Sequence, residues 1–195
     1  MTRGGPPDRS SGAHASVGGD AAPDAGKSAG AGVGSAPGEV MAYIGLGANL
    51  GDAGATLRQA LLELAASPGI AACEASPFYR TAPVDAGGPD FVNAVARLRT
   101  TLAPLALLDL LQALEHRHGR ERPYRNAPRT LDLDLLLYGD RVMHDPRLTL
   151  PHPRLHERAF VLRPLLDLAP GLVLAQGPAA ALLTGLGGQA IERLP

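Results

Sequence analysis

Two aspartates, Asp132 and Asp134, stand one residue apart in the run RTLDLDLLLY, residues 129–138. With the two-residue period of a β-strand, both carboxylates share one face with Leu136 and Tyr138, and the leucines at 131, 133, 135 and 137 share the other. Like charges about 7 Å apart on a strand repel each other, so this pair needs a counter-charge. Mg²⁺ can supply it, because Mg²⁺ binds through one or two carboxylates together with substrate phosphates. The pair therefore predicts a site for a metal-bound polyphosphate.

Four arginines lie within the ten residues 120–129, shortly before the acidic pair: Arg120, Arg122, Arg125 and Arg129. Their planar guanidinium groups can hold phosphate oxygens through two parallel hydrogen bonds. The ordinary alternative is a solvated strand face with the aspartates outside, beside a basic surface loop. The carboxylates and arginines together favour the phosphate site.

Three further features are weaker candidates. His152 lies between Pro151 and Pro153, so a rigid extended segment would present its ring to a ligand, although a surface-loop histidine is the commoner case. Glu115, near the end of a predicted helix, is by itself more typical of an ion pair. Gly45-x-Gly47 lacks the third glycine of a dinucleotide-binding fingerprint and indicates a tight turn.

Composition excludes several function classes. The net charge of −1 argues against a nucleic-acid footprint. No run approaches the roughly 18 apolar residues of a membrane span. The single cysteine, Cys73, cannot form an internal disulfide and fits a cytoplasmic protein.

Residues 1–39 differ in kind from the rest of the chain. They consist mainly of Gly, Ala, Ser and Pro, without Leu, Ile, Phe or Tyr. Such a segment buries too little apolar surface to offset the entropy of ordering, so we expect a disordered tail followed by a domain over 40–195. Met41 stands at the start of the ordered pattern, and we hypothesise that translation begins there.

From residue 40 the pattern alternates between strand and helix periods. Strands are expected over 42–46, 71–79, 91–100 and the aspartate run; helices over 53–66, 104–118 and 154–168; loops over 84–90 and 120–128; and a hairpin at 138–141. Asp52 suits the N-cap of the first helix, and Gly119 ends the second. This order predicts an α+β fold, with a ferredoxin-like βαββαβ antiparallel sheet, helices packed on it and three αβα layers overall.

Five motifs in order are recognisable together: YIGLGANLG at 43–51, SPFYRTAP at 76–83, PDFVNA at 89–94, PRTLDLD at 128–134 and LTLPH at 148–152. Over about residues 41–175, the chain resembles the 6-hydroxymethyl-7,8-dihydropterin pyrophosphokinases of folate biosynthesis. The resemblance implies transfer of diphosphate from ATP to the pterin hydroxymethyl group, with release of AMP. It also implies two Mg²⁺ ions on Asp132 and Asp134, with Arg120 and Arg129 as catalytic phosphate contacts.

The resemblance carries over two sets of binding residues. Those on the ATP side are Gln112, Glu115, Arg122, Leu135, Arg147, Thr149, His152 and Arg158. Those for the pterin are Thr81, Ala82, Val84, Phe91, Asn93 and Phe160. A flat, polar bicycle needs aromatic faces and amide-like edges, which the phenylalanines and Asn93 supply. For Phe160, periodicity alone would favour simple core packing.

Two other functions remain open on the residues alone. One is a catalytically weak nucleotide- or pterin-binding module on the same scaffold; the other is a nucleotidyltransferase, which would release diphosphate instead of AMP. Some family members carry Trp-Gly where this chain has Asn126-Ala127, and Tyr124 could supply the aromatic cover. We expect a monomer acting on small molecules, with no nucleic-acid or membrane partner.

Overall fold

The computed structural model describes residue 1 and residues 38–83, 88–119 and 129–195. The predicted tail lies almost wholly outside these ranges, as do the loop over 120–128 and most of the loop over 84–90. The chain divides into two units, residues 1–31 and 32–195, and every element below belongs to the second.

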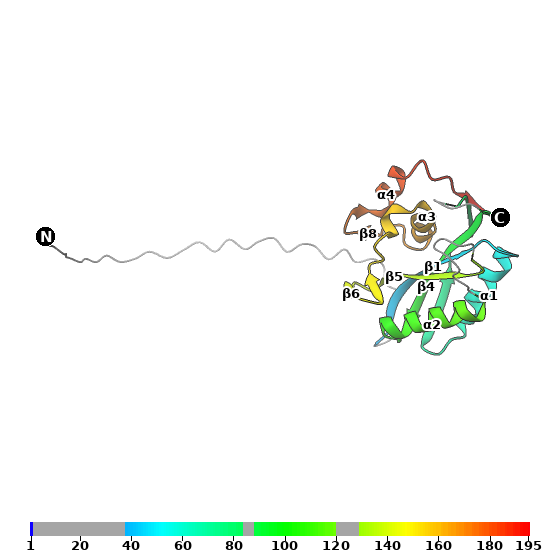
Figure 1. Ribbon diagram of the computed structural model, residues 1–195, viewed down its shortest axis with the longest axis horizontal. Helices are drawn as coiled ribbons and strands as arrows, with labels where there is room; N and C mark the ends of the chain where they lie inside the picture. The colour runs from blue at the N-terminus through cyan, green and yellow to red at the C-terminus, as the bar shows by residue number, and fades with distance from the viewer. Residues whose placement is uncertain (2–37, 84–87, 120–128) are drawn as a thin grey trace. The chain divides into compact units, whose positions relative to one another are not determined.

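A six-stranded antiparallel sheet forms the centre of this unit (Figure 1). Strand β1 (Val40–Ala48) lies between β4 (Phe91–Thr100) and β5 (Asp132–Tyr138). The sheet continues from β4 through β3 (Tyr79–Thr81) to β10 (Glu192–Arg193), while β2 (Ile70–Ala75) pairs with the other end of β4. The prediction of a mixed α/β fold around an antiparallel sheet is confirmed.

Helices cover both faces of the sheet. Helices α1 (Ala53–Ala65) and α2 (Pro104–Arg117) pack their leucines on one face, and α3 (Ala159–Leu168) and α4 (Ala179–Gly185) pack on the other. Figure 1 shows α2 and α3 on opposite sides of β1 and β4. The two hydrophobic clusters are therefore separated by the sheet, and each anchors one layer of helices.

The first two helices begin and end where the sequence predicts, to within one residue. The Asp52 carboxylate accepts a hydrogen bond from the backbone N–H of Ala55 at 2.9 Å, which caps α1. Pro104 occupies the first turn of α2, where its missing N–H costs nothing. Gly119 follows α2 with φ of +72°, a left-handed conformation that favours glycine.

The strand predicted over 71–79 is instead two strands, β2 and β3. The break falls at Ser76-Pro77, where proline has no N–H to donate to a ladder. Ser76 forms two hydrogen bonds with β4. Its N–H donates to the Val95 carbonyl at 2.9 Å, and its hydroxyl accepts from the Val95 N–H at 3.0 Å. The strand is therefore interrupted here while the Val95 N–H keeps a hydrogen-bond partner.

Strand β5 contains a β-bulge that the alternating pattern did not reveal. Opposite β1, Leu137 pairs with Tyr43 and Leu135 pairs with Ile44, so Leu136 is an extra residue. Leu136 and Leu137 both pack on the α3 side, and Tyr138 packs on the α1–α2 side. The predicted alternation is therefore correct through Leu136 and wrong for Leu137 and Tyr138.

Two other predicted elements are wrong in detail. Residues 138–141 form a turn, but β6 (Met143–Asp145) pairs with β7 (Leu148–Leu150) and not with β5. The helix predicted over 154–168 is split at Arg158 into a 3₁₀ turn, η1 (Leu155–Glu157), and α3.

A short ribbon of β8 (Val173–Leu174) and β9 (Gly177–Pro178) precedes α4. Within the described residues, no helix is long and apolar enough to cross a membrane.

The α1–α2 layer yields a prediction about stability. Leu111 of α2 is fully buried, so Leu111→Ala should lower the free energy of unfolding by about 2–5 kcal/mol through lost burial and a residual cavity. Leu62→Ala is the matched control, because Leu62 of α1 is 66% exposed and its loss should change stability by about 0.5 kcal/mol or less. Urea titration followed by circular dichroism measures both, and similar midpoints for the two variants would contradict the assigned core.

Candidate active site

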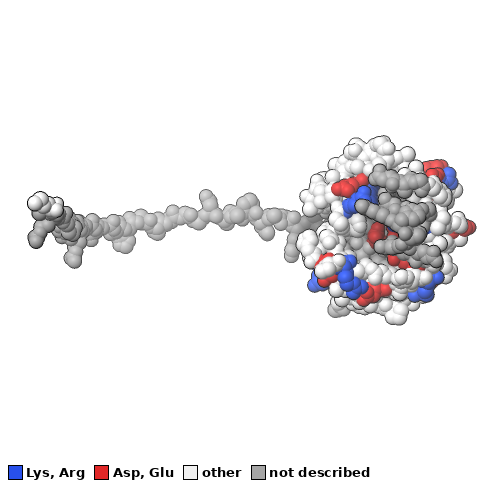
Figure 2. Space-filling view, in the orientation of Figure 1, with Lys and Arg blue, Asp and Glu red and all other residues white. Residues whose placement is uncertain are grey.

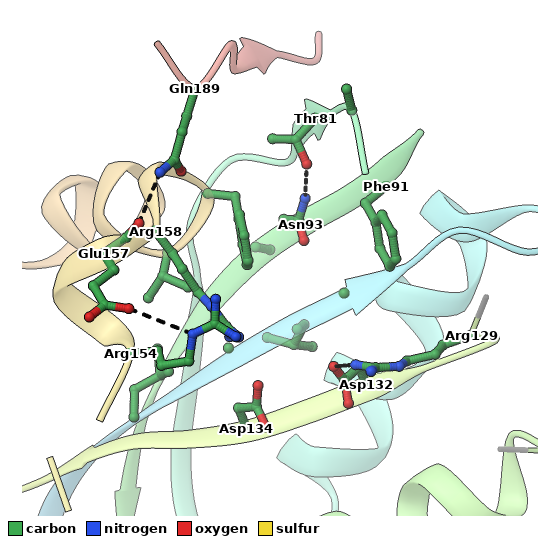
Figure 3. Close-up of a pocket in the computed structure, with 18 residues that line it drawn as sticks. Thr81, Phe91, Asn93, Arg129, Asp132, Asp134, Arg154, Glu157, Arg158 and Gln189 are labelled. Carbon is green, nitrogen blue, oxygen red and sulfur yellow. Dashed lines mark hydrogen bonds and ion pairs between the residues drawn. The ribbon is translucent and has the colours of Figure 1, made fainter. Parts of the chain in front are cut away.

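A cavity of about 300 Å³ opens on the α3 side of the sheet. Its floor is made by β1, β4 and β5, and its walls come from Thr81, Arg129, the segment from Arg154 to Phe160, and Gln189 (Figure 3). Segments that are far apart in the sequence therefore meet at this cavity. The half of the cavity over β5 is charged, and the half over β3 and β4 is polar but uncharged.

The two aspartates project from β5 into the charged half, on one side of the strand as predicted (Figure 3). The Arg129 guanidinium forms an ion pair with the Asp132 carboxylate, and both side chains are largely sheltered, at 26% and 17% exposure. Arg158 enters from the opposite wall. Burial lowers its pKa, the neighbouring Arg154 lowers it further, and Asp134 and Asp132 oppose this shift. Guanidinium groups remain protonated in proteins, so carboxylates and cations face each other across the cavity.

The uncharged half is suited to a flat, polar ligand. The Asn93 amide donates a 2.8 Å hydrogen bond to the Thr81 hydroxyl, and both residues are buried. Phe91 and Phe160 line the same cavity, so Phe160 is not simply a core residue. Aromatic faces beside an amide edge are what a planar heterocycle requires.

Gly45 and Gly47 lie inside β1, so the tight turn predicted there is wrong. A Cβ on Gly47 would stand 3.2 Å from Oδ1 of Asn93, and one on Gly45 would stand 3.5 Å from the Leu136 side chain. Both positions line the cavity. Glycine here keeps the floor low enough for a ligand to approach the backbone.

The buried Asn49, which follows β1, holds Arg129 in place. Its Oδ1 accepts from the Arg129 N–H at 2.7 Å, and its own N–H donates to the Arg129 carbonyl at 3.0 Å. Its amide nitrogen also donates to the Pro89 carbonyl at 3.2 Å. One side chain thus joins the start of the aspartate run to the segment that leads into β4.

His152 is bonded to β5 and interacts electrostatically with Asp134 and Arg158, but it does not line the cavity. It follows a cis Leu150–Pro151 peptide, and its N–H donates to the Leu136 carbonyl of β5 at 2.8 Å. Burial lowers the pKa of His152, Asp134 opposes this, and Arg158 adds to the lowering. Its Nδ1 accepts from the Arg154 N–H at 3.2 Å, which leaves Nε2 to carry the proton of the neutral ring.

Five other residues expected on the ATP side also lie away from the cavity lining. The buried Glu115 carboxylate accepts from the Leu133 N–H at 2.7 Å and so supports β5 from behind. Leu135 is a core residue, and Gln112 is exposed on α2. Arg147, beside Thr149 of β7, forms an ion pair with Asp109 of α2. Arg120, Arg122 and Val84 lie outside the described residues.

Three residues that line the cavity were not predicted from the sequence: Arg154, Glu157 and Gln189. Asn49 lies in the first family motif, but no role was predicted for it. Arg154 and Glu157 form an ion pair at 3.6 Å on the cavity wall. Arg154 follows the LTLPH motif closely, which could have drawn attention to it. Gln189 comes from near the other end of the domain, and only the tertiary structure brings it to the cavity.

The donor set fits Mg²⁺ better than zinc. Among the residues that the structure describes, no group of three or more His, Cys, Asp and Glu side chains is placed to hold a metal ion. A structural zinc site needs about four protein ligands, whereas Mg²⁺ uses one or two carboxylates and takes its other ligands from phosphates and water. Asp132 and Asp134 on one wall supply that smaller set.

Figure 2 shows the charged side chains on one face of the molecule. Basic and acidic side chains are interspersed there in small groups. The cavity combines a carboxylate pair, arginines and an aromatic half, and this chemistry is suited to an enzyme site for a metal-bound polyphosphate beside a planar ligand.

Comparison with known proteins gives the family. Residues 43–170 match the model of 7,8-dihydro-6-hydroxymethylpterin-pyrophosphokinase, and the chain belongs to this family. The 2-amino-4-hydroxy-6-hydroxymethyldihydropteridine pyrophosphokinase of Pseudomonas aeruginosa is 46% identical over 155 residues, which cover 78% of this chain and 96% of that protein. The Haemophilus influenzae protein of the same name is 44% identical over 136 residues, 69% of this chain and 85% of that one. The family resemblance inferred from the motifs is confirmed.

Solved structures agree on the fold. The Plasmodium falciparum HPPK-DHPS wild type with SDX-DHP matches with a TM-score of 0.61 at 13% identity, over 76% of this chain. The chain spans 44% of the length of that protein.

The lowered pKa of His152 predicts a pH effect on stability without ligands. The native state binds fewer protons than the unfolded chain, so this contribution to stability is complete above the usual histidine pKa of about 6.5 and is lost as the pH falls through the lower native value. His152→Asn should therefore show a flatter dependence of unfolding free energy on pH below about 6.5. Urea titrations across this range measure it, with His144→Asn on the exposed surface as control. Equal slopes for the two variants would contradict the lowered pKa of the half-buried His152.

Proposed function

We propose that this chain transfers the diphosphate group of ATP to the hydroxymethyl group of 6-hydroxymethyl-7,8-dihydropterin, giving AMP and the pterin diphosphate in folate synthesis. The observation that carries the proposal is that one cavity is lined by the Asp132–Asp134 pair, the Thr81–Asn93 pair and Phe91. Family membership supports the same reaction. Neither the comparisons nor the intact carboxylate pair supports the weak binding module.

In the proposed step, the hydroxymethyl oxygen attacks the β-phosphorus of ATP. The bond from the β-phosphorus to the oxygen bridging it to the α-phosphorus breaks, AMP keeps that oxygen, and the hydroxyl proton passes to solvent. Charge moves onto phosphate oxygens, so positioning and electrostatics carry most of the catalysis. Two Mg²⁺ ions, held by Asp132 and Asp134, would neutralise the triphosphate and align it. Arg129 and Arg158 provide fixed positive charge, Arg129 beside Asp132 and Arg158 on the opposite wall.

The uncharged half of the cavity would hold the pterin. Phe91 and Phe160, which both line the cavity, are proposed to stack on the two faces of the ring, and Asn93, oriented by Thr81, would offer an acceptor and a donor to its edge. Ala82 lines the same cavity, and Val84 is proposed as a pterin contact on the family resemblance alone. A close fit on both faces also excludes water, which would otherwise compete with the hydroxymethyl group for the β-phosphorus.

The remaining expected ATP contacts are proposed by family resemblance. They are Arg120, which is proposed as catalytic, and Gln112, Glu115, Arg122, Leu135, Arg147, Thr149 and His152. His152 is bonded to β5 and interacts with Asp134, which supports the proposal that the nucleotide binds near this end of β5. Because the Glu115 carboxylate is bonded to the Leu133 N–H, we propose that it acts by supporting β5.

We further propose that residues 40–195 form the functional domain and act as a cytoplasmic monomer on small molecules. The strand order β2-β4-β1-β5, with α1 and α2 as connections, supports a ferredoxin-like βαββαβ core.

Product identity tests the function directly. The full chain is incubated with ATP, Mg²⁺ and 6-hydroxymethyl-7,8-dihydropterin, and nucleotides and pterins are separated by chromatography. AMP in equal amount to a diphosphorylated pterin is expected. ADP would indicate transfer of one phosphate, free diphosphate would indicate nucleotidyl transfer, and either result would refute the proposal. A chain beginning at residue 41 that retains full activity would show that the tail is dispensable.

Asp134→Ala should lower the rate of AMP formation by at least about a hundredfold, because it removes half of the proposed metal-binding pair. Its circular dichroism spectrum should match that of the unmodified chain, since Asp134 lies at a cavity surface. Asp140→Ala in the exposed turn after β5 is the control and should retain full activity. Retention of more than a few per cent activity in Asp134→Ala would count against the metal role.

Arg129→Ala should lower kcat by about 10²–10³-fold while changing the KM for ATP much less, since its charge is proposed to act mainly in the transition state. Arg129→Lys should recover only part of kcat, because an ammonium group lacks the bidentate geometry. Steady-state kinetics with both substrates varied gives the two constants. Proportionate changes in kcat and KM would contradict this role.

A further inference from the structure

The C-terminal segment returns to the site after α4. Strand β10 pairs with β3, and the Leu194 N–H donates to the Phe78 carbonyl at 2.8 Å. Between α4 and β10, Gln189 reaches the cavity wall beside Arg158 and Phe160 (Figure 3). This residue lies outside residues 43–170, the part that matches the family model.

The Gln189 carboxamide bridges two backbone groups on either side of Arg158. Its Oε1 accepts from the Ala159 N–H at 2.9 Å, and its Nε2 donates to the Glu157 carbonyl at 2.9 Å. Ala159 is the first residue of α3, and the residue before it caps the helix with no side-chain hydrogen bond. Gln189 therefore satisfies a helix N–H that local sequence leaves unpaired.

The bridge fixes the point at which η1 ends and α3 begins. Arg158 is extended there, with φ of −124° and ψ of 111°, and this break directs its side chain into the cavity instead of along a continuous helix. Its guanidinium carbon lies 5.5 Å from the centroid of the Phe160 ring. The Arg154–Glu157 ion pair at 3.6 Å holds the same turn from its other side.

We propose that Gln189 is a positioning residue of the active site, which locks the turn from Glu157 to Ala159 so that Arg158 and Phe160 face the bound substrates. The proposal rests on the proposed function for the assignment of the pterin to Phe160. A carboxamide suits the task because it accepts from one backbone group and donates to the other. A carboxylate could accept from Ala159 but would meet the Glu157 carbonyl with a second acceptor.

Gln189→Met tests the proposal in the full chain, because methionine has a similar length and cannot form either bond. Isothermal titration calorimetry with 6-hydroxymethyl-7,8-dihydropterin, in the presence of Mg²⁺ and a non-hydrolysable ATP analogue, should show affinity weakened by about three- to thirtyfold. Gln189→Glu should fall between Gln189→Met and the unmodified chain, since it keeps one bond. Unchanged affinity in Gln189→Met would overturn the proposal.

Tyr79→Phe provides the matched control. The Tyr79 hydroxyl donates to Asp167 of α3 at 2.5 Å, so the variant loosens the opposite end of the same helix, and Tyr79 does not line the cavity. It should lower the melting temperature while leaving pterin affinity unchanged. If both variants lose stability and affinity in the same proportion, Gln189 has only a structural role and the proposal is wrong.

Amide hydrogen exchange separates this proposal from the proposed function. Absence of pterin binding and of AMP formation by the unmodified chain would refute the proposed function alone. In that case, faster exchange confined to Ala159 and Phe160 in Gln189→Met would still support positioning of the turn. Exchange that is unchanged, or that rises throughout α3 and α4, would overturn it.

Discussion

Repulsion between two carboxylates on one strand face is the constraint around which the other parts of this site are arranged. Asp132 and Asp134 stand on the same side of β5 in a sheltered cavity, where water screens their charges poorly. Arg129 pairs with one of them from the same strand end, and Arg158 is aimed at both from the opposite wall. The charges of the described cavity residues are close to balance, so a further cation adds the least net charge when it arrives together with anionic groups of a ligand. A metal-bound polyphosphate satisfies that condition.

Several interactions outside the cavity keep this charged arrangement in place. Glu115 receives the Leu133 N–H between the two aspartates, Asn49 holds both backbone groups of Arg129, and His152 is bonded to the carbonyl of Leu136. Each uses a side chain or backbone from a different element to fix the position of β5 or its flank. A site built on a strand held in this way has little freedom to relax, which is what preorganised electrostatics require.

The sequence predicted most of the elements and the family, because both depend on local patterns. The period-two run around the aspartates, the Asp52 cap and the glycine after α2 were each readable from a few neighbouring residues. The bulge at Leu136 was not readable, because it is visible only in the register between β5 and β1. The break at Arg158 also escaped detection, since the bond that stabilises it comes from Gln189, thirty residues away. Long-range contacts of this kind leave no periodic trace in the chain.

The bare backbone at Gly47 has a consequence for inhibitor design. A single added carbon there would meet the Asn93 amide at 3.2 Å, in space that lines the cavity. A compound that contacts the backbone at Gly47 occupies space that a substitution of this residue can only reduce, because every other amino acid adds side-chain atoms. Substitutions that expel such a compound would also obstruct the natural ligand, so resistance at this position would come at the expense of the enzyme's own activity.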